Sequence, residues 1–262
     1  MRYFLSRACR SVATRLAAEK TLCAFDYDGT LAPIAAHPEQ ARMRATTRRL
    51  LTKLTALYPC AVISGRAKRD LLERLAGTGV TRAIGNHGAD AGSPPREAPP
   101  EVEKWATELA PILAALDGVW VENKGRSLAV HYRQSVHKSE ARRSILAAVR
   151  KLRQARVFGG KQVVNIVPAG APNKGTALMI ERDRVGGNSV LYVGDDDNDE
   201  DAFALAVDVV AVRIGRKPTS RARYYLRDQP EIDRLLELLI GLRSGAERVR
   251  AAADRRARLS RP

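Results

Sequence analysis

The chain has 262 residues, of which 45% are hydrophobic and 28% charged, so it can bury the core of one large domain or two modest ones. No apolar run approaches the roughly 18 residues of a membrane helix or the roughly 7–15 residues of a signal-peptide core, so we expect no membrane association. The formal net charge of +16 raises the possibility of nucleic-acid binding, but more than half of it lies in residues 1–20 and 241–262 and no series of stacking aromatic residues accompanies it. We therefore expect mostly solvated charge and no specific nucleic acid, with attraction of an anionic small substrate as the second interpretation.

Residues 1–20 are rich in arginine, and Glu19 is their only acid. We interpret them as an amphipathic helix that leads into the first strand, with a transit peptide as the alternative. The three cysteines, Cys9, Cys23 and Cys60, form no close-spaced metal pattern, and the last two lie in apolar runs where a reduced thiol packs as a small hydrophobe. The sequence therefore favours a reducing, cytoplasmic setting.

Continuous apolar runs alternate with helical patterns, which is typical of a parallel α/β sheet buried on both faces. The predicted strands are 22–25, 61–63, 190–193 and 209–212. Helical spacing predicts helices at about 42–58, 66–77, 174–184, 201–207 and 231–242. Glycines follow the last helix, so we expect the basic tail, about 243–262, to be frayed.

The middle of the chain has a different pattern, which begins after a proline-punctuated linker at 93–100. Apolar spacing predicts helices at 102–116 and 138–152, and strand pairs at 119–124 with 127–133 and at 156–158 with 162–167, the second pair turning at Gly159-Gly160. The predicted fold class is therefore α/β, with a Rossmann-like parallel-sheet core and an inserted αββαββ unit. We expect the core to comprise residues 1–89 and 170–262, and the insert residues 90–169.

Polar residues follow three of the predicted core strands, at the end where open parallel sheets bind ligands. They are Asp26 and Asp28, then Ser64-Gly65-Arg66, then Asp195, Asp196 and Asp199. Carboxylates this close repel one another unless a cation lies between them, and Mg²⁺ together with a phosphate suits such an oxygen-rich site. Any one of these acids could instead cap a helix or turn, but five acids at two apolar strand ends favour a metal site.

Lys174 stands at the start of a predicted helix, where a positive charge works against the helix dipole. An anionic partner is therefore the better interpretation than a solvated lysine. Ser64 and Gly65 lie at a strand-to-helix turn and can offer a hydroxyl and backbone N–H groups to phosphate oxygens. Taken alone, Ser-Gly-Arg is a weak signal.

These motifs, in this order, resemble the four motifs of the haloacid dehalogenase superfamily. They are Asp26-Tyr27-Asp28-Gly29-Thr30, Ser64, Lys174 and Gly194-Asp195-Asp196-Asp197-Asn198-Asp199. More closely, the chain resembles the trehalose-6-phosphate phosphatase family over about residues 20–240. The segments that carry this resemblance are 25–34, 62–66, 85–88, 122–133, 160–178 and 192–203.

The resemblance implies a phosphatase in which Asp26 is the nucleophile and forms an aspartyl-phosphate, while Asp28 is the general acid and base. It implies that Mg²⁺ is held by Asp26, by the backbone carbonyl of Asp28 and by Asp195, with Asp196 and Asp199 holding its waters. Ser64 and Lys174 would bind phosphate oxygens. The reaction implied is hydrolysis of trehalose 6-phosphate in trehalose biosynthesis.

In this family the insert is a cap that excludes water and contacts the substrate. Strand alternation places Glu122 and Lys124 on one face with Trp120, while a solvated role is the stronger interpretation for His131 and Arg133. The resemblance favours contacts from Glu122 and Lys124 to sugar hydroxyls. The predicted substrate-binding set is completed by Ser64, Gly65, Arg66, His87, Arg133 and Asn165.

Asn165 stands where the family commonly has a glutamate that binds glucose hydroxyls, so the exact sugar stays open. Phosphatases of sucrose 6-phosphate or mannosyl-3-phosphoglycerate are the enzyme alternatives. A catalytically silent sugar-phosphate sensor and a polyanion-binding protein are the alternatives from other classes; the intact acid set and the placement of the charge argue against them. We expect a monomer.

Overall fold

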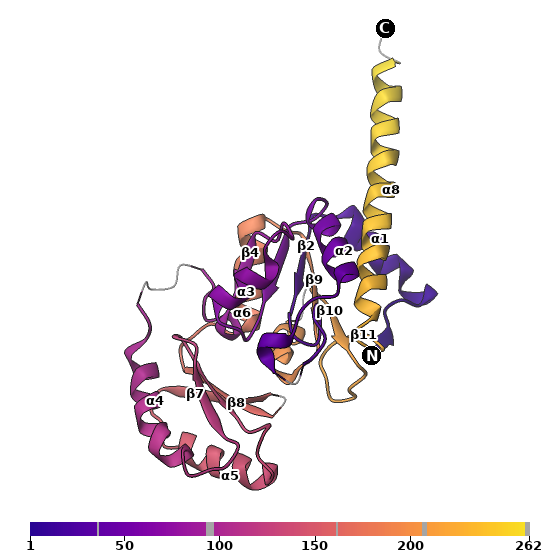
Figure 1. Ribbon diagram of the computed structural model, residues 1–262. Coiled ribbons are helices and arrows are strands. Elements are labelled where there is room, and N and C mark those ends of the chain that lie inside the picture. Colours follow the sequence, from indigo (N-terminus) through magenta and orange to yellow (C-terminus); the bar gives the residue numbers. More distant parts are fainter. Residues whose placement is uncertain (36, 93–96, 161, 206–208, 260–262) are drawn as a thin grey trace.

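The structure is a computed structural model that describes residues 1–35, 37–92, 97–160, 162–205 and 209–259. Two sheets organise it, a parallel sheet in the core and an antiparallel sheet in a separate cap (Figure 1). The linker predicted at 93–100 and the end of the helix predicted at 201–207 lie partly outside the described residues. The α/β fold class predicted from the sequence is confirmed.

The core sheet is parallel throughout, in the order β1-β11-β10-β9-β2-β3-β4. Its strands are β1 (Arg2–Tyr3), β2 (Thr21–Phe25), β3 (Cys60–Ile63), β4 (Arg82–Ile84), β9 (Ser189–Gly194), β10 (Val209–Ile214) and β11 (Tyr224–Leu226). The four predicted apolar runs are β2, β3, β9 and β10, and each is buried almost throughout. The strands β1, β4 and β11 were not predicted, because two or three residues are too few to show a period.

Helices cover both faces of this sheet. The helices α1 (Arg10–Ala18), α2 (Ala45–Thr55), α3 (Lys68–Leu75) and α8 (Glu231–Leu259) share one apolar cluster, to which Leu51, Leu71 and Leu236 belong. The opposite cluster holds Leu178 of α6 (Lys174–Val185) and Phe203 of α7 (Glu200–Phe203). Four 3₁₀ turns complete the chain, at η1 (Arg7–Cys9), η2 (Pro38–Gln40), η3 (Asn86–Gly88) and η4 (Asp197–Asp199). Cys9, Cys23 and Cys60 are free thiols, all buried.

The prediction of a frayed basic tail is wrong, because α8 continues as one helix to Leu259 and extends away from the core (Figure 1). Its first part packs on α1 and α2 through Leu235, Leu236 and Leu239. Gly241 and Gly245 lie inside the helix, where a glycine costs only about 1 kcal/mol relative to alanine. The alanines and arginines that follow are strong helix formers, which explains why the glycines do not end the helix.

The insert forms the cap as predicted, in the order αββαββ. Its elements are α4 (Pro100–Leu113), β5 (Trp120–Asn123), β6 (Leu128–His131), α5 (Lys138–Val149), β7 (Ala155–Gly160) and β8 (Val163–Pro168). The sheet order is β5-β6-β8-β7, antiparallel throughout. One predicted detail is wrong: Gly159 and Gly160 do not form the turn but belong to β7, where they pair with Val164 and Val163.

The connections between core strands change direction at β2, which has β3 on one side and β9 on the other. In open parallel sheets such a switch point forms a crevice at the carboxyl ends of the strands. Both β2 and β9 end in acidic residues, so the sheet topology brings these acids together. Among the described helices, none is both long and apolar enough to cross a membrane.

Candidate active site

Carboxylates from the ends of β2 and β9 lie next to one another, as the sequence predicted. One oxygen each of Asp26, Asp195 and Asp199 lies within 4.8 Å of the other two. Asp26 is only 5% exposed and Asp195 only 6%. Buried carboxylates at this distance repel strongly, so the arrangement needs positive charge nearby.

Lys174, the first residue of α6, supplies one such charge from the core. Its ammonium lies 3.0 Å from Asp26 Oδ1 and 2.7 Å from Asp199 Oδ1, and the side chain is 1% exposed. Burial lowers the pKa of Lys174, but the carboxylates of Asp199 and Asp26 outweigh this and raise it above its ordinary value. The lysine therefore stays charged beside Asp26, as its position at a helix start suggested.

Asp199 holds the acidic loop in place. Its Oδ1 also accepts a hydrogen bond from the Tyr192 hydroxyl at 2.7 Å, and its Oδ2 accepts the backbone N–H groups of Asp195 at 2.8 Å and Asp196 at 2.9 Å. Asp199 is fully buried, and a Cβ at Gly194 would come within 2.3 Å of its Cγ. The carboxylate thus ties Lys174, Tyr192 and the loop after β9 into one unit.

Burial raises the pKa of Asp26, and the carboxylates of Asp199, Asp195 and Asp28 raise it further. The ammonium of Lys174 acts in the opposite direction. A divalent cation between Asp26 and Asp195 would lower this pKa and keep the Asp26 carboxyl group ionised.

Asp28 is held by Arg66. The guanidinium donates to both carboxylate oxygens of Asp28, each at 2.7 Å, and its third nitrogen donates to Asp70 Oδ2 at 2.6 Å. Arg74 Nε donates to the other oxygen of Asp70 at 2.8 Å. Alternating positive and negative side chains therefore connect Arg74 of α3 to Asp28. Arg66, which was predicted to bind substrate, instead contacts Asp28, the predicted general acid.

The turn after β3 is closed by His87. The backbone N–H of His87 donates to Ser64 O at 2.9 Å, and a Cβ on Gly65 would lie only 2.3 Å from His87 Cε1. Glycine is therefore required at position 65 for this close approach. His87 has a positive φ of 58°, and its ring lies against Gly65 in the Ser64 turn.

The imidazole of His87 connects the core to the cap. Its Nε2 donates to Asn165 Oδ1 of β8 at 3.1 Å, and its Nδ1 accepts from Asn198 Nδ2 of η4 at 3.4 Å. Burial lowers the pKa of His87 well below its ordinary value, and the nearby Lys124 and Lys174 lower it further. The ring is therefore a neutral imidazole with one donor and one acceptor.

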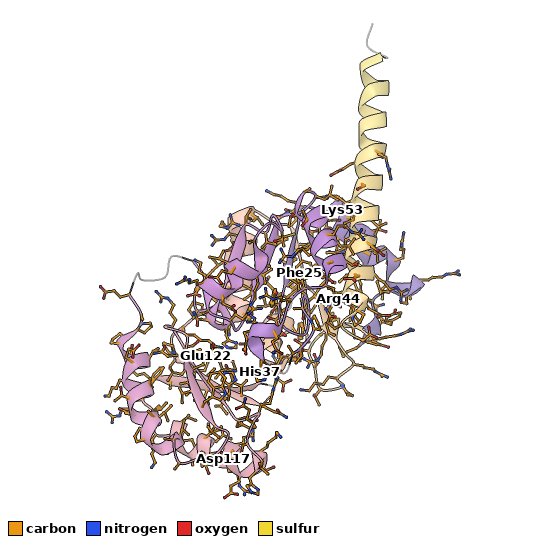
Figure 2. All side chains as sticks on the ribbon, viewed as in Figure 1. Phe25, His37, Arg44, Lys53, Asp117 and Glu122 are labelled. Carbon is orange, nitrogen blue, oxygen red and sulfur yellow. The ribbon has the colours of Figure 1, made fainter. Side chains whose placement is uncertain are left out.

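The cap presents a polar strand face to the core, and Figure 2 shows Glu122 of β5 where the two parts face each other. Lys124 Nζ donates to Gly65 O at 3.0 Å, and Glu122 Oε2 lies 2.9 Å from His131 Nε2. Arg133 donates to Ala35 O at 2.7 Å, which links the cap to the loop after β2. The predicted placement of Trp120, Glu122 and Lys124 on one face is confirmed, because all three line one cavity.

A cavity of about 260 Å³ lies between these groups, near the lower limit of about 300 Å³ for ligand pockets. All the predicted site residues except Asp199 line it; they are Asp26, Asp28, Ser64, Gly65, Arg66, His87, Glu122, Lys124, Arg133, Asn165, Lys174, Asp195 and Asp196. Asp199 lies behind the wall. The cavity is also lined by residues that the prediction did not select, among them Ile34, Asp70, Trp120, His131 and Asn198. Strand alternation had placed Trp120 beside Glu122, and this was the one available signal.

The donor set fits a magnesium ion. Asp26 and Asp195 offer neighbouring carboxylate oxygens, hard donors of the kind that Mg²⁺ prefers, and the backbone carbonyl of Asp28 would add a third oxygen donor. Gly29 has a φ of 79°, and a Cβ there would lie 2.1 Å from Asp195 Oδ2. The chain therefore uses a glycine to let the loop after β2 approach this carboxylate.

Comparisons with known proteins agree with this geometry. In solved structures, the C-terminal domain of Candida albicans trehalose-6-phosphate phosphatase matches with a TM-score of 0.75 and 22% identity, over 88% of this chain and 96% of that one. A sugar phosphatase of haloacid dehalogenase subclass IIB matches with a TM-score of 0.61 and 15% identity, over 85% of this chain and 99% of that one. At these identities the matches show the fold.

Relatives found by sequence have a higher sequence identity to this chain than these solved structures have. The trehalose-phosphate phosphatase of Mycolicibacterium paratuberculosis is 34% identical over 92% of this chain and 63% of its own length, and that of Mycobacterium tuberculosis is 34% identical over 73% and 53%. The chain thus spans less than two thirds of the length of these relatives. The sequence profile of trehalose-phosphatase matches residues 24–229. The chain belongs to the trehalose-phosphatase family.

Proposed function

We propose that this chain hydrolyses trehalose 6-phosphate to trehalose and phosphate. One observation carries the proposal: Asp26 lies on the cavity wall, 3.0 Å from the Lys174 ammonium, and the cap strand with Glu122 and Lys124 lines the same cavity. The proposed nucleophile, the proposed phosphate-binding cation and the proposed sugar-binding groups thus line one cavity. The names of the relatives support the choice of sugar.

The first step is an attack by the Asp26 carboxylate on phosphorus. A bond forms between an Asp26 oxygen and phosphorus while the ester bond to the sugar oxygen breaks, which leaves an aspartyl-phosphate. Lys174 offsets the negative charge that gathers on the phosphoryl oxygens, and Ser64 binds one of them. When bound by Asp26, Asp195 and the Asp28 carbonyl, Mg²⁺ supplies further charge neutralisation and in-line orientation.

Asp28 transfers the protons in both steps of the reaction. It donates one to the departing sugar oxygen and takes one from the water that hydrolyses the aspartyl-phosphate. Both of its oxygens accept hydrogen bonds from Arg66 in this structure, so Asp28 must release at least one of them before it can act as an acid.

A related phosphatase of another sugar phosphate is the second candidate, and Asn165 is the observation that favours it. This side chain is only 3% exposed and accepts a hydrogen bond from His87, in the position where the family commonly offers a charged carboxylate. An amide binds sugar hydroxyls more weakly than a carboxylate does.

The variant Asn165→Glu tests how this position contributes to sugar recognition. We expect KM for trehalose 6-phosphate to change by about tenfold, because hydrogen bonds to a charged group are worth about 1–2 kcal/mol more. The rate with glycerol phosphate should change far less. Steady-state kinetics on both esters measure this, and equal changes would show that residue 165 does not contact the sugar.

The proposed function is tested by phosphate release, with Mg²⁺ present, from a panel of trehalose 6-phosphate, sucrose 6-phosphate, mannosyl-3-phosphoglycerate and glucose 6-phosphate. We expect the highest kcat/KM with trehalose 6-phosphate. A higher kcat/KM for another ester would contradict trehalose 6-phosphate as the substrate but would leave the proposed mechanism unchanged. No release from any of them would favour the sensor.

We also propose the domain division given by the sequence, with residues 1–89 and 170–262 as the core and 90–169 as the cap. The separate apolar cluster of the cap, which includes Trp105, Val130 and Ile145, supports this division. That the protein is a monomer and works in the cytoplasm stays a prediction.

A further inference from the structure

Trp120 is an exposed aromatic residue on the wall of the active-site cavity. Among the described residues, five large hydrophobic side chains are exposed: Ile34, Leu72, Ile112, Trp120 and Val136. Of these, Ile34 and Trp120 line this cavity. An exposed apolar surface inside a charged pocket points to a ligand with an apolar face, because phosphate and metal ions bind polar and charged groups and not apolar surface.

The indole of Trp120 is held in a fixed orientation. It stacks on the imidazole of His131 with ring centroids 4.0 Å apart and an angle of 13° between the planes. His131 is in turn fixed by its contact with Glu122 Oε2 at 2.9 Å. One face of the indole is therefore covered, and the side chain still has 42% of its surface exposed. This is a preorganised flat platform.

The position of this platform along β5 relates it to the phosphate site. Trp120 and Glu122 lie on one face of β5, Lys124 directly follows this strand, and all three side chains line the same cavity. Lys124 lies at the phosphate end, because its Nζ contacts Gly65 O in the Ser64 turn at 3.0 Å. Trp120 lies four residues before Lys124, so their Cα atoms are about 13 Å apart at about 3.3 Å per residue. Glu122 lies between the two, with its Oε2 only 3.7 Å from Lys124 Nζ. A sugar ring held by Lys124 and Glu122 therefore leaves Trp120 available to a second, linked ring.

We propose that Trp120 binds the second pyranose ring of a disaccharide phosphate, the ring that does not carry the phosphate. This rests on the proposed function and adds to it the means of distinguishing disaccharide from monosaccharide phosphates. The C–H groups on one face of a pyranose ring pack against the exposed indole face, while Glu122 contacts hydroxyls of the first ring. Ile34, from the core, adds apolar surface to the same cavity.

Kinetics with two substrates test the proposal. In Trp120→Ala we expect kcat/KM for trehalose 6-phosphate to fall about tenfold, mainly through KM, while the value for glucose 6-phosphate stays within about twofold. Trp120→Phe should retain most of the activity because it keeps an aromatic face. Ile112→Ala is the matched control, since Ile112 is a similarly exposed cap residue away from the cavity. Equal losses on both substrates, or none on either, would overturn the proposal.

A binding measurement separates this proposal from the proposed function. The chain has two tryptophans, and Trp105 is only 2% exposed, so tryptophan fluorescence can report on Trp120. In Asp26→Asn, where no turnover is expected, trehalose 6-phosphate should change the emission and glucose 6-phosphate should not. The change should vanish when Trp120→Phe is added. These responses would support the platform even if no ester were hydrolysed, whereas an unchanged emission with a bound disaccharide phosphate would overturn it.

Discussion

At the scale of single residues, the site depends on buried charges that neutralise one another. Asp199 accepts hydrogen bonds from Lys174, Tyr192 and two backbone N–H groups, so both of its oxygens are used within the protein. Its predicted role in holding a metal-bound water stays a prediction. What the geometry supports is that Asp199 positions Lys174 beside Asp26.

The proposed role of Asp26 as the nucleophile can be tested directly with Asp26→Asn. We expect kcat to fall by at least about 10³-fold, because the amide cannot form the acyl phosphate. The thermal unfolding midpoint should not fall, since the change removes one charge from a crowded acidic site. Asp117→Asn, on the surface of the cap (Figure 2), is the control and should keep full activity. Substantial phosphate release by Asp26→Asn would exclude Asp26 as the nucleophile.

His87 makes stability depend on pH. Its pKa is lowered in the folded state, whereas in the unfolded chain it binds a proton below about pH 6.5, so the folded state loses stability as the pH falls through this value. We expect this histidine alone to reduce the unfolding free energy by up to about 1.4 kcal/mol between pH 7.5 and pH 5.5.

Urea unfolding at the two pH values measures this effect. His87→Gln should be less sensitive to acid than the wild type, while His137→Gln, at an exposed position, should show the wild-type dependence. If all three proteins lost the same free energy between the two pH values, the neutral His87 would not be the cause.

At the scale of elements, the site is built from the short turns that follow the parallel strands. Two of these turns depend on a glycine with no room for a side chain, Gly29 against Asp195 and Gly65 against His87. The functional groups converge because β2 and β9 are neighbours at the point where the strand connections reverse.

The close approach of Gly29 gives a prediction with a matched control. Gly29 and Gly215 have φ values of 79° and 78°, but a Cβ at Gly215 would meet no atom within 4 Å. Both alanine variants should lose about 1–2 kcal/mol of stability from backbone strain. Only Gly29→Ala should also displace Asp195, lose activity and need more Mg²⁺ for half-maximal rate. Equal kinetics of the two variants would show that the clash is relieved without moving the carboxylate.

The sequence was sufficient to predict those helices and strands whose hydrophobic pattern can be recognised within the element itself. The strands β2 and β9 are continuous apolar runs, and the cap strands alternate, so both their type and their faces could be predicted. The pairing of Arg66 with Asp28 could not, because it depends on where α3 lies relative to β2. The same holds for the stack of Trp120 on His131, which requires the register of β5 on β6. The end of α8 was missed because glycine was given more weight than the helix formers after it.

At the scale of the whole molecule, the proposed reaction involves both the core and the cap, because residues of both line one cavity. Among the described residues, hydrogen bonds join Lys124 with Gly65, Ser127 with Asn86, His87 with Asn165 and Arg133 with Ala35, and the His87 ring also packs edge-on against Phe158 with centroids 4.8 Å apart. Interfaces of this kind are compatible with relative motion of the two parts. Most of the net positive charge of the chain lies in its two end segments, 1–20 and 241–262, and no described residue of these segments lines the cavity.

Metal removal tests the complete assembly. Treatment with EDTA should stop phosphate release, and added Mg²⁺ should restore it fully. The thermal unfolding midpoint should rise with Mg²⁺ concentration, because an ion that binds only the folded state stabilises it and relieves the repulsion between Asp26 and Asp195. The Asp195→Asn variant should show a weaker shift. A metal-free enzyme with an undiminished rate would contradict the mechanism.

The burial of all three cysteines makes the surface of this protein unreactive toward maleimide dyes. Cys9, Cys23 and Cys60 are 0%, 1% and 4% exposed, and the chain contains no other cysteine. A thiol introduced at Lys53 of the core and another at Asp117 of the cap, both at the surface in Figure 2, could therefore be labelled selectively. Single-molecule energy transfer between the two dyes would then show whether the cap moves relative to the core when substrate is added, without first removing any native cysteine.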